Sequence, residues 1–419
     1  MDRSLYDRFT QILKDEMVPA LGCTEPIAIA YASAVCSSLL NDEIVSGVVE
    51  ASGNIIKNVK GVVVPSSEGM KGIEAATALG ALGGNPELEL EVLSTVDEED
   101  RLKAKTLMKN IKVKLLSSDC KLHIRVTLQG KDHTATVEIA GSHTNIVQKV
   151  LDGEILFSKI YHEENGKECI YEGMSVKNIV EFAETTDLDA LTAILERAIE
   201  YNSAIAKEGI DGNWGVGVGK NILKYYGEGV NSKARAYAAA GSDARMSGCL
   251  NPVVINSGSG NQGITVTMPV VVYAEYLGVS HEKLLRALII SNLISIHQKS
   301  KIGRLSAYCG AVSASCGAGA AITWLKGGSV DMIKSTIVNT LANVSGILCD
   351  GAKQSCAAKI ASALDAALMA DMLTSEHETF AAGEGIVKDD IEKTIASVGE
   401  IARKGMEETD KTILSVMIE

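Results

Sequence analysis

The sequence predicts an α+β fold: a large, mainly α-helical domain with a smaller, inserted or appended α/β domain whose mixed sheet is mostly antiparallel. Two patterns predict it. Between residues 43 and 172, Val, Ile and Thr alternate with polar residues in short runs. From Ser175 almost to the end, the apolar residues follow helical spacing instead. A chain of 419 residues, 46% of them hydrophobic, is also long enough for roughly two or three domains.

Residues 1–42 contain two helical patterns. Residues 5–21 have helical apolar spacing, and residues 25–40 continue it after an interruption at Gly22–Pro26. Because the β-rich region that follows has the character of an insertion, we expect both N-terminal helices to pack with the C-terminal helical domain.

Residues 43–172 form the predicted small α+β domain. Six segments have the strand pattern, at residues 43–52, 87–95, 112–116, 121–129, 133–141 and 154–162. Two helices are expected between them, at residues 71–84 and 97–110. The connections between the last strands are short, which predicts that these strands are antiparallel.

Residues 173–419 form the predicted helical domain. Aromatic residues make up only 4% of the chain and there are 39 glycines, so Ala, Val, Ile and Leu must pack closely around glycine. Leu305–Leu325 carries no charge and is long enough to span a bilayer. It consists mostly of Gly, Ala and Ser, however, so a tightly packed buried helix or loop is the better prediction.

The charge balance excludes several classes of partner. The net charge is −13 and the pI about 5.2, which disfavours binding to nucleic acid or to an acidic membrane surface. The N-terminus has charges throughout and no apolar core, so it is not a secretory signal and a cytoplasmic location is expected. Thiols stay reduced there, so the nine cysteines indicate metal binding, catalysis or burial rather than disulfides.

Glycine-rich segments offer possible anion sites. Gly258–Gly263 spells GxGxxG, but the βαβ context of a dinucleotide site is absent. Gly215–Asn221 lacks the residues that a phosphate loop needs at both ends. We expect the first segment to place Asn261 and Gln262 at a helix start that suits a carboxylate, with close helix packing as the equal alternative. Lys71 precedes another helix, where it either holds an anionic substrate or belongs to a solvated turn.

Four cysteines form two CX6C pairs, Cys309 with Cys316 and Cys349 with Cys356. On one continuous helix the members of a pair would lie about 10 Å apart. Gly351 can break the second segment, so that Cys349 ends one helix and Cys356 begins another. Four such cysteines can ligate a [4Fe–4S] cluster or zinc, and burial as small apolar side chains is the alternative.

Cys23 lies just before a predicted helix start, in Gly-Cys-Thr-Glu-Pro. The helix dipole there predicts a thiol of low pKa that acts as a base, a nucleophile or a metal ligand. An inert buried cysteine is the alternative. The remaining cysteines show no partner pattern and are interpreted as structural; they are Cys36, Cys120, Cys169 and Cys249.

Five motifs together resemble the L-cysteine desulfidase family, which is related to the iron–sulfur L-serine dehydratases. They are GCTEPIAIA, EGMKGIEAATALGALGGNPE, SGSGNQG, CGAVSASCGAGAA and ILCDGAKQSCAAKIASALDAA. The resemblance runs nearly end to end. It implies conversion of L-cysteine to pyruvate, ammonia and sulfide with a [4Fe–4S] cluster in the helical domain and without pyridoxal phosphate.

The resemblance also implies roles for individual residues. Cys309, Cys349 and Cys356 would bind the cluster and leave one iron open, Cys316 would not be a ligand, and Cys23 would be the base. The related dehydratases hold the substrate carboxylate with a Ser-His-Thr segment. Its counterpart here would be Ser142, His143 and Thr144, although a lone histidine after a strand more often has a structural role.

Other functions stay open at this point. An L-serine or L-threonine dehydratase would use the same scaffold with another leaving group. A non-catalytic iron–sulfur sensor would use the same cysteines, but no DNA-binding or signalling module is visible. Pyridoxal-phosphate catalysis has no recognisable lysine setting. We expect a homodimer that acts on a small amino acid, with neither a nucleic-acid nor a membrane partner.

Overall fold

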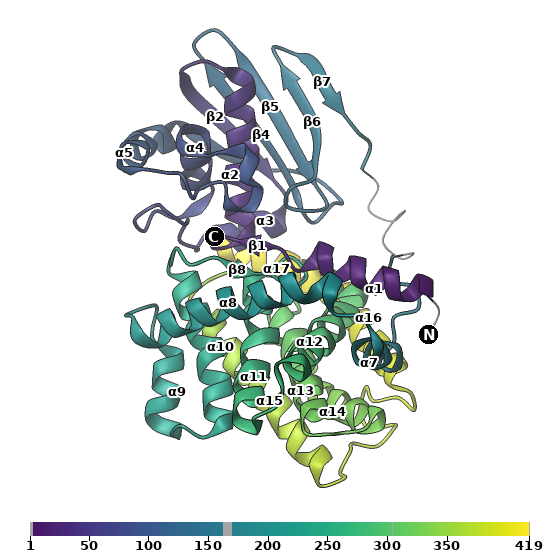
Figure 1. Cartoon of the computed structure of the whole chain (residues 1–419). Helices are drawn as coiled ribbons and strands as arrows, with labels where there is room; N and C mark the ends of the chain where they lie inside the picture. Colours follow the sequence, from purple (N-terminus) through teal and green to yellow (C-terminus); the bar gives the residue numbers. More distant parts are fainter. Residues whose placement is uncertain (1–2, 162–169, 304, 419) are drawn as a thin grey trace.

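The computed structural model describes residues 3–161, 170–303 and 305–418. It has the predicted α+β fold, with a sheet at one end of the molecule and a large group of helices at the other (Figure 1). Cys169, which the sequence indicates to be structural, lies outside the described residues.

The main sheet has six strands in the order β3-β2-β4-β5-β6-β7. The strands are β2 (Ile44–Ala51), β3 (Ile111–Leu115), β4 (His123–Gly130), β5 (Thr134–Ala140), β6 (Ile146–Leu151) and β7 (Glu154–Ser158). β2 and β3 are parallel and the other neighbours are antiparallel, so the predicted mixed, mostly antiparallel sheet is confirmed. A second sheet pairs β1 (Pro19–Ala20) with β8 (Val253–Val254) and joins the N-terminal segment to the helical region.

One predicted strand is wrong. Residues 87–95 alternate in polarity, but Pro86–Glu91 forms a 3-10 helix, η1. Pro86 occupies the first turn and the side chain of Asn85 accepts a hydrogen bond from Glu87 N at 3.1 Å, which favours a helical start. The short strand β6 has too little alternation to be predicted from its sequence.

Helices α2 (Thr24–Leu40), α4 (Gly72–Gly83) and α5 (Glu98–Leu107) lie beside the sheet (Figure 1). The expectation that both N-terminal helices pack with the C-terminal ones is wrong for α2, which packs on α4, β4 and β5. α2 is apolar on nearly every side, so it is stable only between two layers. Gly80 allows the close approach, since a Cβ there would lie 2.2 Å from Ala30 O. Helix α1 (Arg3–Glu16) does lie against helical partners, α8 and α12.

The helical region continues to the end of the described chain. Its helices are α7 (Val176–Thr185), α8 (Asp189–Asp211), α9 (Val218–Tyr226), α10 (Val230–Met246), α11 (Gly260–Leu277), α12 (His281–Ile302), α13 (Gly310–Leu325), α14 (Val330–Asn343), α15 (Cys356–Ser375), α16 (Ile391–Glu400) and α17 (Glu407–Ile418). Helix α3 (Gly53–Val59) follows β2 and packs against α17. The domain boundaries at residues 42 and 172 stay a prediction.

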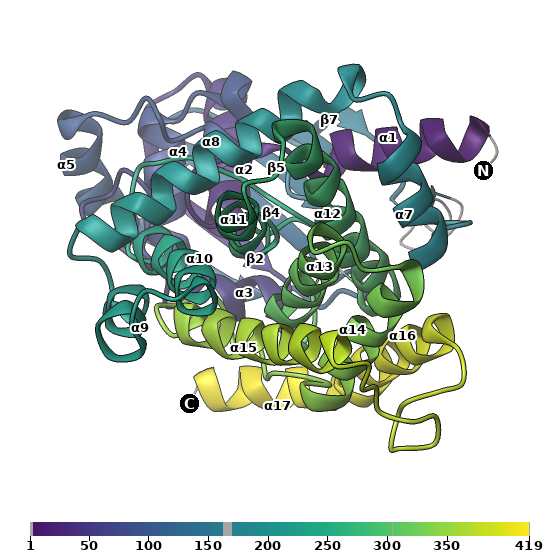
Figure 2. The same cartoon turned by 60° about the horizontal axis from the view of Figure 1, so that its bottom comes forward.

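Helix α13 lies inside this region, among α11, α12, α14 and α15 (Figure 2). It covers most of the uncharged stretch that the sequence predicts to be tightly packed, and nearly all its residues are buried. A Cβ on Gly317 would lie 2.3 Å from Ser291 O on α12, so glycine is what lets these helices touch. Within the described part of the chain, no helix has the length and apolar character needed to cross a membrane.

Candidate functional site

A cavity of about 100 Å³ opens where the sheet end meets the helices. Four cysteines line it, and we call it the cysteine cavity: Cys23, Cys309, Cys349 and Cys356. Cys316 does not line it and is buried in α13. A larger cavity of about 420 Å³ lies along the main sheet, around His123 and Glu138, and contains none of the predicted site residues.

Cys309 and Cys349 lie side by side because their backbones pair. Cys309 N donates to Ile347 O at 2.9 Å, Cys349 N donates to Ala307 O at 2.6 Å, and Tyr308 and Leu348 form an antiparallel bridge between them. The prediction that Cys349 ends a helix is therefore wrong. Helix α14 ends at Asn343, and Cys349 lies in an extended segment held by this pairing.

The Cys349 thiol lies among positive charges. The neighbouring Cys309 thiol donates a hydrogen bond to it, and Lys57 and Lys359 lie nearby, so the pKa of Cys349 falls to about 6 despite burial. The same contact with Cys349, together with burial, raises the pKa of Cys309. One of the two thiols is thus ready to bind metal as a thiolate.

Cys356 reaches the cavity through a sharp turn. It is the first residue of α15, as the sequence predicts. Gly351 precedes it with a φ of +98°, and a Cβ on Gly351 would lie 2.3 Å from Lys57 O. Only glycine fits both the backbone angle and the space, so Gly351 brings the two cysteines of this segment to one cavity.

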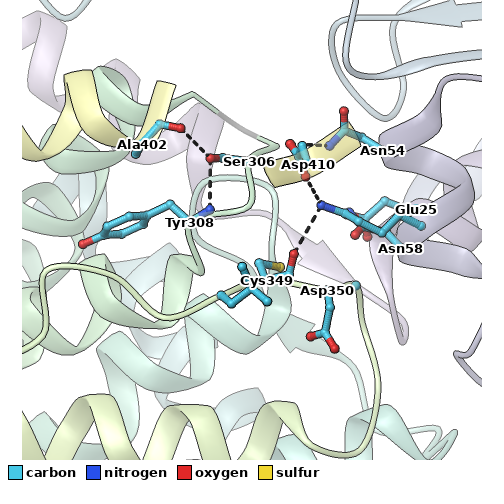
Figure 3. Close-up of polar contacts among 12 residues, drawn as sticks. Glu25, Asn54, Asn58, Ser306, Tyr308, Cys349, Asp350, Ala402 and Asp410 are labelled. Carbon is cyan, nitrogen blue, oxygen red and sulfur yellow. Dashed lines mark hydrogen bonds and ion pairs between the residues drawn. The ribbon is translucent and has the colours of Figure 1, made fainter. Parts of the chain in front are cut away.

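Lys57 fastens the Cys349 segment to the rest of the molecule. Its side chain is 2% exposed, its Nζ donates to Cys349 O at 3.4 Å, and it forms an ion pair with Asp410 on α17. Asn54 Nδ2 also donates to Asp410, at 3.0 Å. Figure 3 shows Asn54 and Asp410 above the Cys349 carbonyl, so elements from both ends of the chain meet at this cysteine.

Ser306 holds the segment before Cys309 in a similar way. Its Oγ donates to Ala402 O at 3.1 Å and accepts a hydrogen bond from Tyr308 N at 3.1 Å (Figure 3). The two cysteine segments are therefore fixed by hydrogen bonds to separate elements.

Cys23 lies immediately before α2, as predicted, and its thiol donates to Glu25 Oε2 at 3.2 Å. The predicted low pKa is wrong, because burial and the negative charge of Glu25 raise the pKa of Cys23 well above its usual value. These two effects outweigh the helix start and the positive charge of Arg245.

Glu25 is an acidic residue in the first turn of α2. Its carboxylate accepts hydrogen bonds from Cys23, from Thr24 Oγ1 at 3.1 Å and from Asn58 Nδ2 at 3.0 Å. Burial raises the pKa of Glu25, but the charge of His143 and the hydrogen bond from Cys23 more than compensate, and the pKa falls below its usual value. Glu25 is therefore a buried carboxylate beside a protonated thiol.

The predicted substrate residues divide into two groups. Asn261 and Gln262 lie in the first turn of α11 and line the cysteine cavity. Lys71 does not line it; this exposed residue stands at the N-cap position of α4 and makes no capping hydrogen bond with its side chain. Ser142, His143 and Thr144 form a turn after β5 and do not line the cavity either, although His143 is buried and its charge acts on Glu25.

The cavity contains three charged residues that sequence reasoning missed: Glu25, Arg245 at the last turn of α10, and Lys299 on α12. For Arg245 the local signal is limited to its neighbours in AAAGSDARM, which are mostly small and suit a closely packed helix. The sequence around Lys57 gave no indication that this lysine is buried beside the Cys349 segment.

The cavity suits a group held by cysteines at several points. Among the residues described, no three His, Cys, Asp or Glu side chains converge closely enough for one metal ion. A cluster of several irons takes one cysteine at each iron, so its ligands need not converge on one point. Such a group fits three cysteines, two from the paired segments and one from a helix start. Lys57 and Lys359 would offset its negative charge.

Comparison with known proteins places this arrangement in a family. Residues 87–415 match the serine dehydratase alpha chain family, and the chain belongs to that family. A UPF0597 protein of Lachnoclostridium phytofermentans is 52% identical over 416 residues, which are 99% of this chain and 100% of the relative. A UPF0597 protein of Treponema denticola is 50% identical over 430 residues, covering 100% and 99% of the two chains. A third, from Desulfitobacterium hafniense, is 48% identical over 417 residues, covering 99% and 97%.

Proposed function

We propose that this protein is a lyase that converts L-cysteine to pyruvate, ammonia and sulfide without pyridoxal phosphate. Membership of the serine dehydratase alpha chain family supports the reaction class, a β-elimination from a small amino acid. The observation that carries the proposal is that Cys23 opens into the same cavity as Cys309, Cys349 and Cys356, although 286 positions (309 − 23) separate it from the first of them.

Cys309, Cys349 and Cys356 would hold a [4Fe–4S] cluster, and Cys316 would not. When bound through three cysteines, such a cluster supplies a Lewis acid for the leaving group of the substrate. Lys57 and Lys359 would balance the charge of the cysteine thiolates.

Cys23 would remove the Cα proton of the substrate. Its thiol donates to Glu25, so the carboxylate holds the sulfur in place. Burial and the charge of Glu25 keep this thiol protonated in the substrate-free protein, so Cys23 would act as a base only after losing its own proton. The sulfur then leaves from Cβ with the electrons of the Cβ–S bond. The aminoacrylate product tautomerises to an imine, and water hydrolyses the imine to pyruvate and ammonia.

L-Cysteine is the proposed substrate because a thiolate is a weaker base than hydroxide and leaves more readily. The family description favours a second candidate, L-serine dehydration, which differs only in the leaving group. A homodimer and a cytoplasmic location stay predictions; analytical ultracentrifugation tests the first.

One experiment tests the activity and the cofactor together. Protein purified without oxygen should contain about four iron and four sulfide ions per chain and release pyruvate from L-cysteine with a higher kcat/KM than from L-serine. The opposite order would establish the dehydratase. A loaded cluster with pyruvate from neither amino acid would favour the sensor.

A matched pair of variants tests the ligand assignment. Cys349→Ala should abolish the cluster absorbance, whereas Cys316→Ala should keep it, since Cys316 lies outside the cavity. Full cluster retention in Cys349→Ala would contradict the ligand set.

A further inference from the structure

Arg245 is a buried cation that has no acidic partner in the part of the chain that the structure describes. It is 2% exposed, lines the cysteine cavity, and donates from Nη1 to Asn261 Oδ1 at 3.0 Å. Its buried Nε has no hydrogen-bond partner among the described residues. Burying a charge is costly unless an opposite charge or hydrogen bonds compensate, so this guanidinium is prepared for an anion.

The start of α11 is fitted closely around this guanidinium. A Cβ on Gly260 would lie 2.4 Å from Arg245 Nε and 2.7 Å from Cζ, so glycine is what lets the first turn of the helix press against it. The side chain of Ser259, at the N-cap, makes no capping hydrogen bond. The positive end of an 18-residue helix therefore adds to the charge of Arg245.

The cavity also contains the polar side chains of Glu25 and Gln262. The positive charge of Arg245 helps to lower the pKa of Glu25, but the hydrogen bonds of this carboxylate come from Cys23, Thr24 and Asn58 and not from the guanidinium. Gln262 Oε1 is buried in the cavity and has no hydrogen-bond partner among the described residues. An acceptor beside a cation matches the two ends of a zwitterion, with a carboxylate at the arginine and an ammonium at the amide oxygen.

We propose that Arg245, oriented by Asn261 and the start of α11, binds the α-carboxylate of the amino-acid substrate. This assignment rests on the proposed function and gives Arg245 a role that the sequence analysis considered for Lys71 and for Ser142–Thr144. It makes the carboxylate a large contributor to binding, so thiols that lack one should bind more weakly than L-cysteine. The competing explanation is that Arg245 offsets the charge of the cluster and its thiolates.

Two fragments of the substrate separate these explanations. 3-Mercaptopropionate keeps the thiol and the carboxylate of L-cysteine, and cysteamine keeps the thiol and the ammonium. Their dissociation constants are measured by calorimetry on anaerobic, cluster-loaded, full-length protein. A charged hydrogen bond contributes about 1.5–3 kcal/mol, so Arg245→Gln should weaken 3-mercaptopropionate roughly 10- to 150-fold. Cysteamine should change less than about threefold.

One control changes another residue of the same helix, and the second makes a different substitution at Arg245. Arg235→Gln removes another arginine of α10, one that pairs with Asp365, and should change neither constant. Arg245→Lys keeps the charge without the two-pronged geometry and should give an intermediate loss. It also serves as the test if Arg245→Gln fails to fold.

Three outcomes would overturn the proposal: equal weakening of both fragments, an unchanged constant for 3-mercaptopropionate, or loss of cluster absorbance in Arg245→Lys. Failure of the proposed function has another signature. Wild-type protein would then release no pyruvate, while the binding of the two fragments would still report on Arg245.

Discussion

At the residue scale, the contact between Cys23 and Glu25 decides how the cavity can handle a proton. The thiol is buried and protonated, and its hydrogen bond to a carboxylate of lowered pKa keeps the proton on sulfur until substrate binds. A cysteine at a helix start usually gains acidity from the dipole, but the burial and the neighbouring charge here reverse that effect.

Replacing Cys23 tests this proton transfer. Cys23→Ser should keep the cluster absorbance, because Cys23 is not among the proposed ligands, and should lower pyruvate release by roughly 100-fold or more. The measurement is kcat on L-cysteine together with the visible spectrum. A variant with unaltered turnover would assign the base to another group.

A second residue-scale prediction concerns pH. His123 and Arg125 both bond to Glu138 in the sheet, and the hydrogen bond from His123 contributes most to lowering the pKa of Glu138 from 4.5 to about 2. A lowered carboxyl pKa stabilises the folded state above pH 4.5, and this stabilisation is lost as the pH falls toward 2. Glu138→Gln should therefore be less stable than wild type at pH 6, and the difference in Tm should narrow below about pH 4. A constant difference across that range would refute the explanation.

At the element scale, the turn between Cys349 and α15 depends on Gly351. Gly351 and Gly383 have similar φ angles, +98° and +93°, but a Cβ would collide with Lys57 O only at Gly351, since nothing lies within 4 Å at Gly383. Comparing substitutions at the two positions therefore separates the cost of backbone strain from the cost of steric collision.

Alanine at these two positions should therefore have unequal effects. Gly383→Ala should cost about 1–2 kcal/mol of unfolding free energy from backbone strain alone. Gly351→Ala should cost more than about 3 kcal/mol and weaken cluster retention, because the collision displaces the Cys349 segment. Urea unfolding and iron content measure both effects, and equal losses would show that the contact with Lys57 is unimportant.

At the scale of the whole molecule, helix α17 supports the site from outside the cavity. Helix α17 packs on α3, and Asp410 pairs with Lys57 across 353 positions of sequence. Lys57 in turn donates to the backbone of Cys349. The C-terminal helix thereby stabilises a cysteine segment that it does not belong to.

Asp410→Asn should leave a buried ammonium without its counter-charge, at a cost of about 3–5 kcal/mol. We expect a lower Tm and faster alkylation of Cys349 in cluster-free protein, followed by mass spectrometry. Asp389→Asn is the control: it breaks an exposed pair with Lys393, which typically contributes about 1 kcal/mol or less. Equal alkylation of Cys349 in the two variants would contradict the role of α17.

The sequence by itself determined the structural features that depend only on residues close together along the chain. The alternation in β2, β4 and β5, the helical spacing after Ser175, and the helix starts at Cys23 and Cys356 follow from local patterns. Such patterns set which face of a strand or helix is apolar, and that preference survives whatever the element packs against. The fold class was predictable for this reason.

Only the tertiary structure decided which residues meet. The packing of α2 on the sheet, the pairing of Cys309 with Cys349, and the burial of Arg245 depend on contacts between distant segments. Lys71 and Asn261 both lie at helix starts, and nothing local distinguishes the one that faces the cavity. Long-range packing also set the acidity of Cys23, because burial and Glu25 outweighed the helix start that the sequence could show.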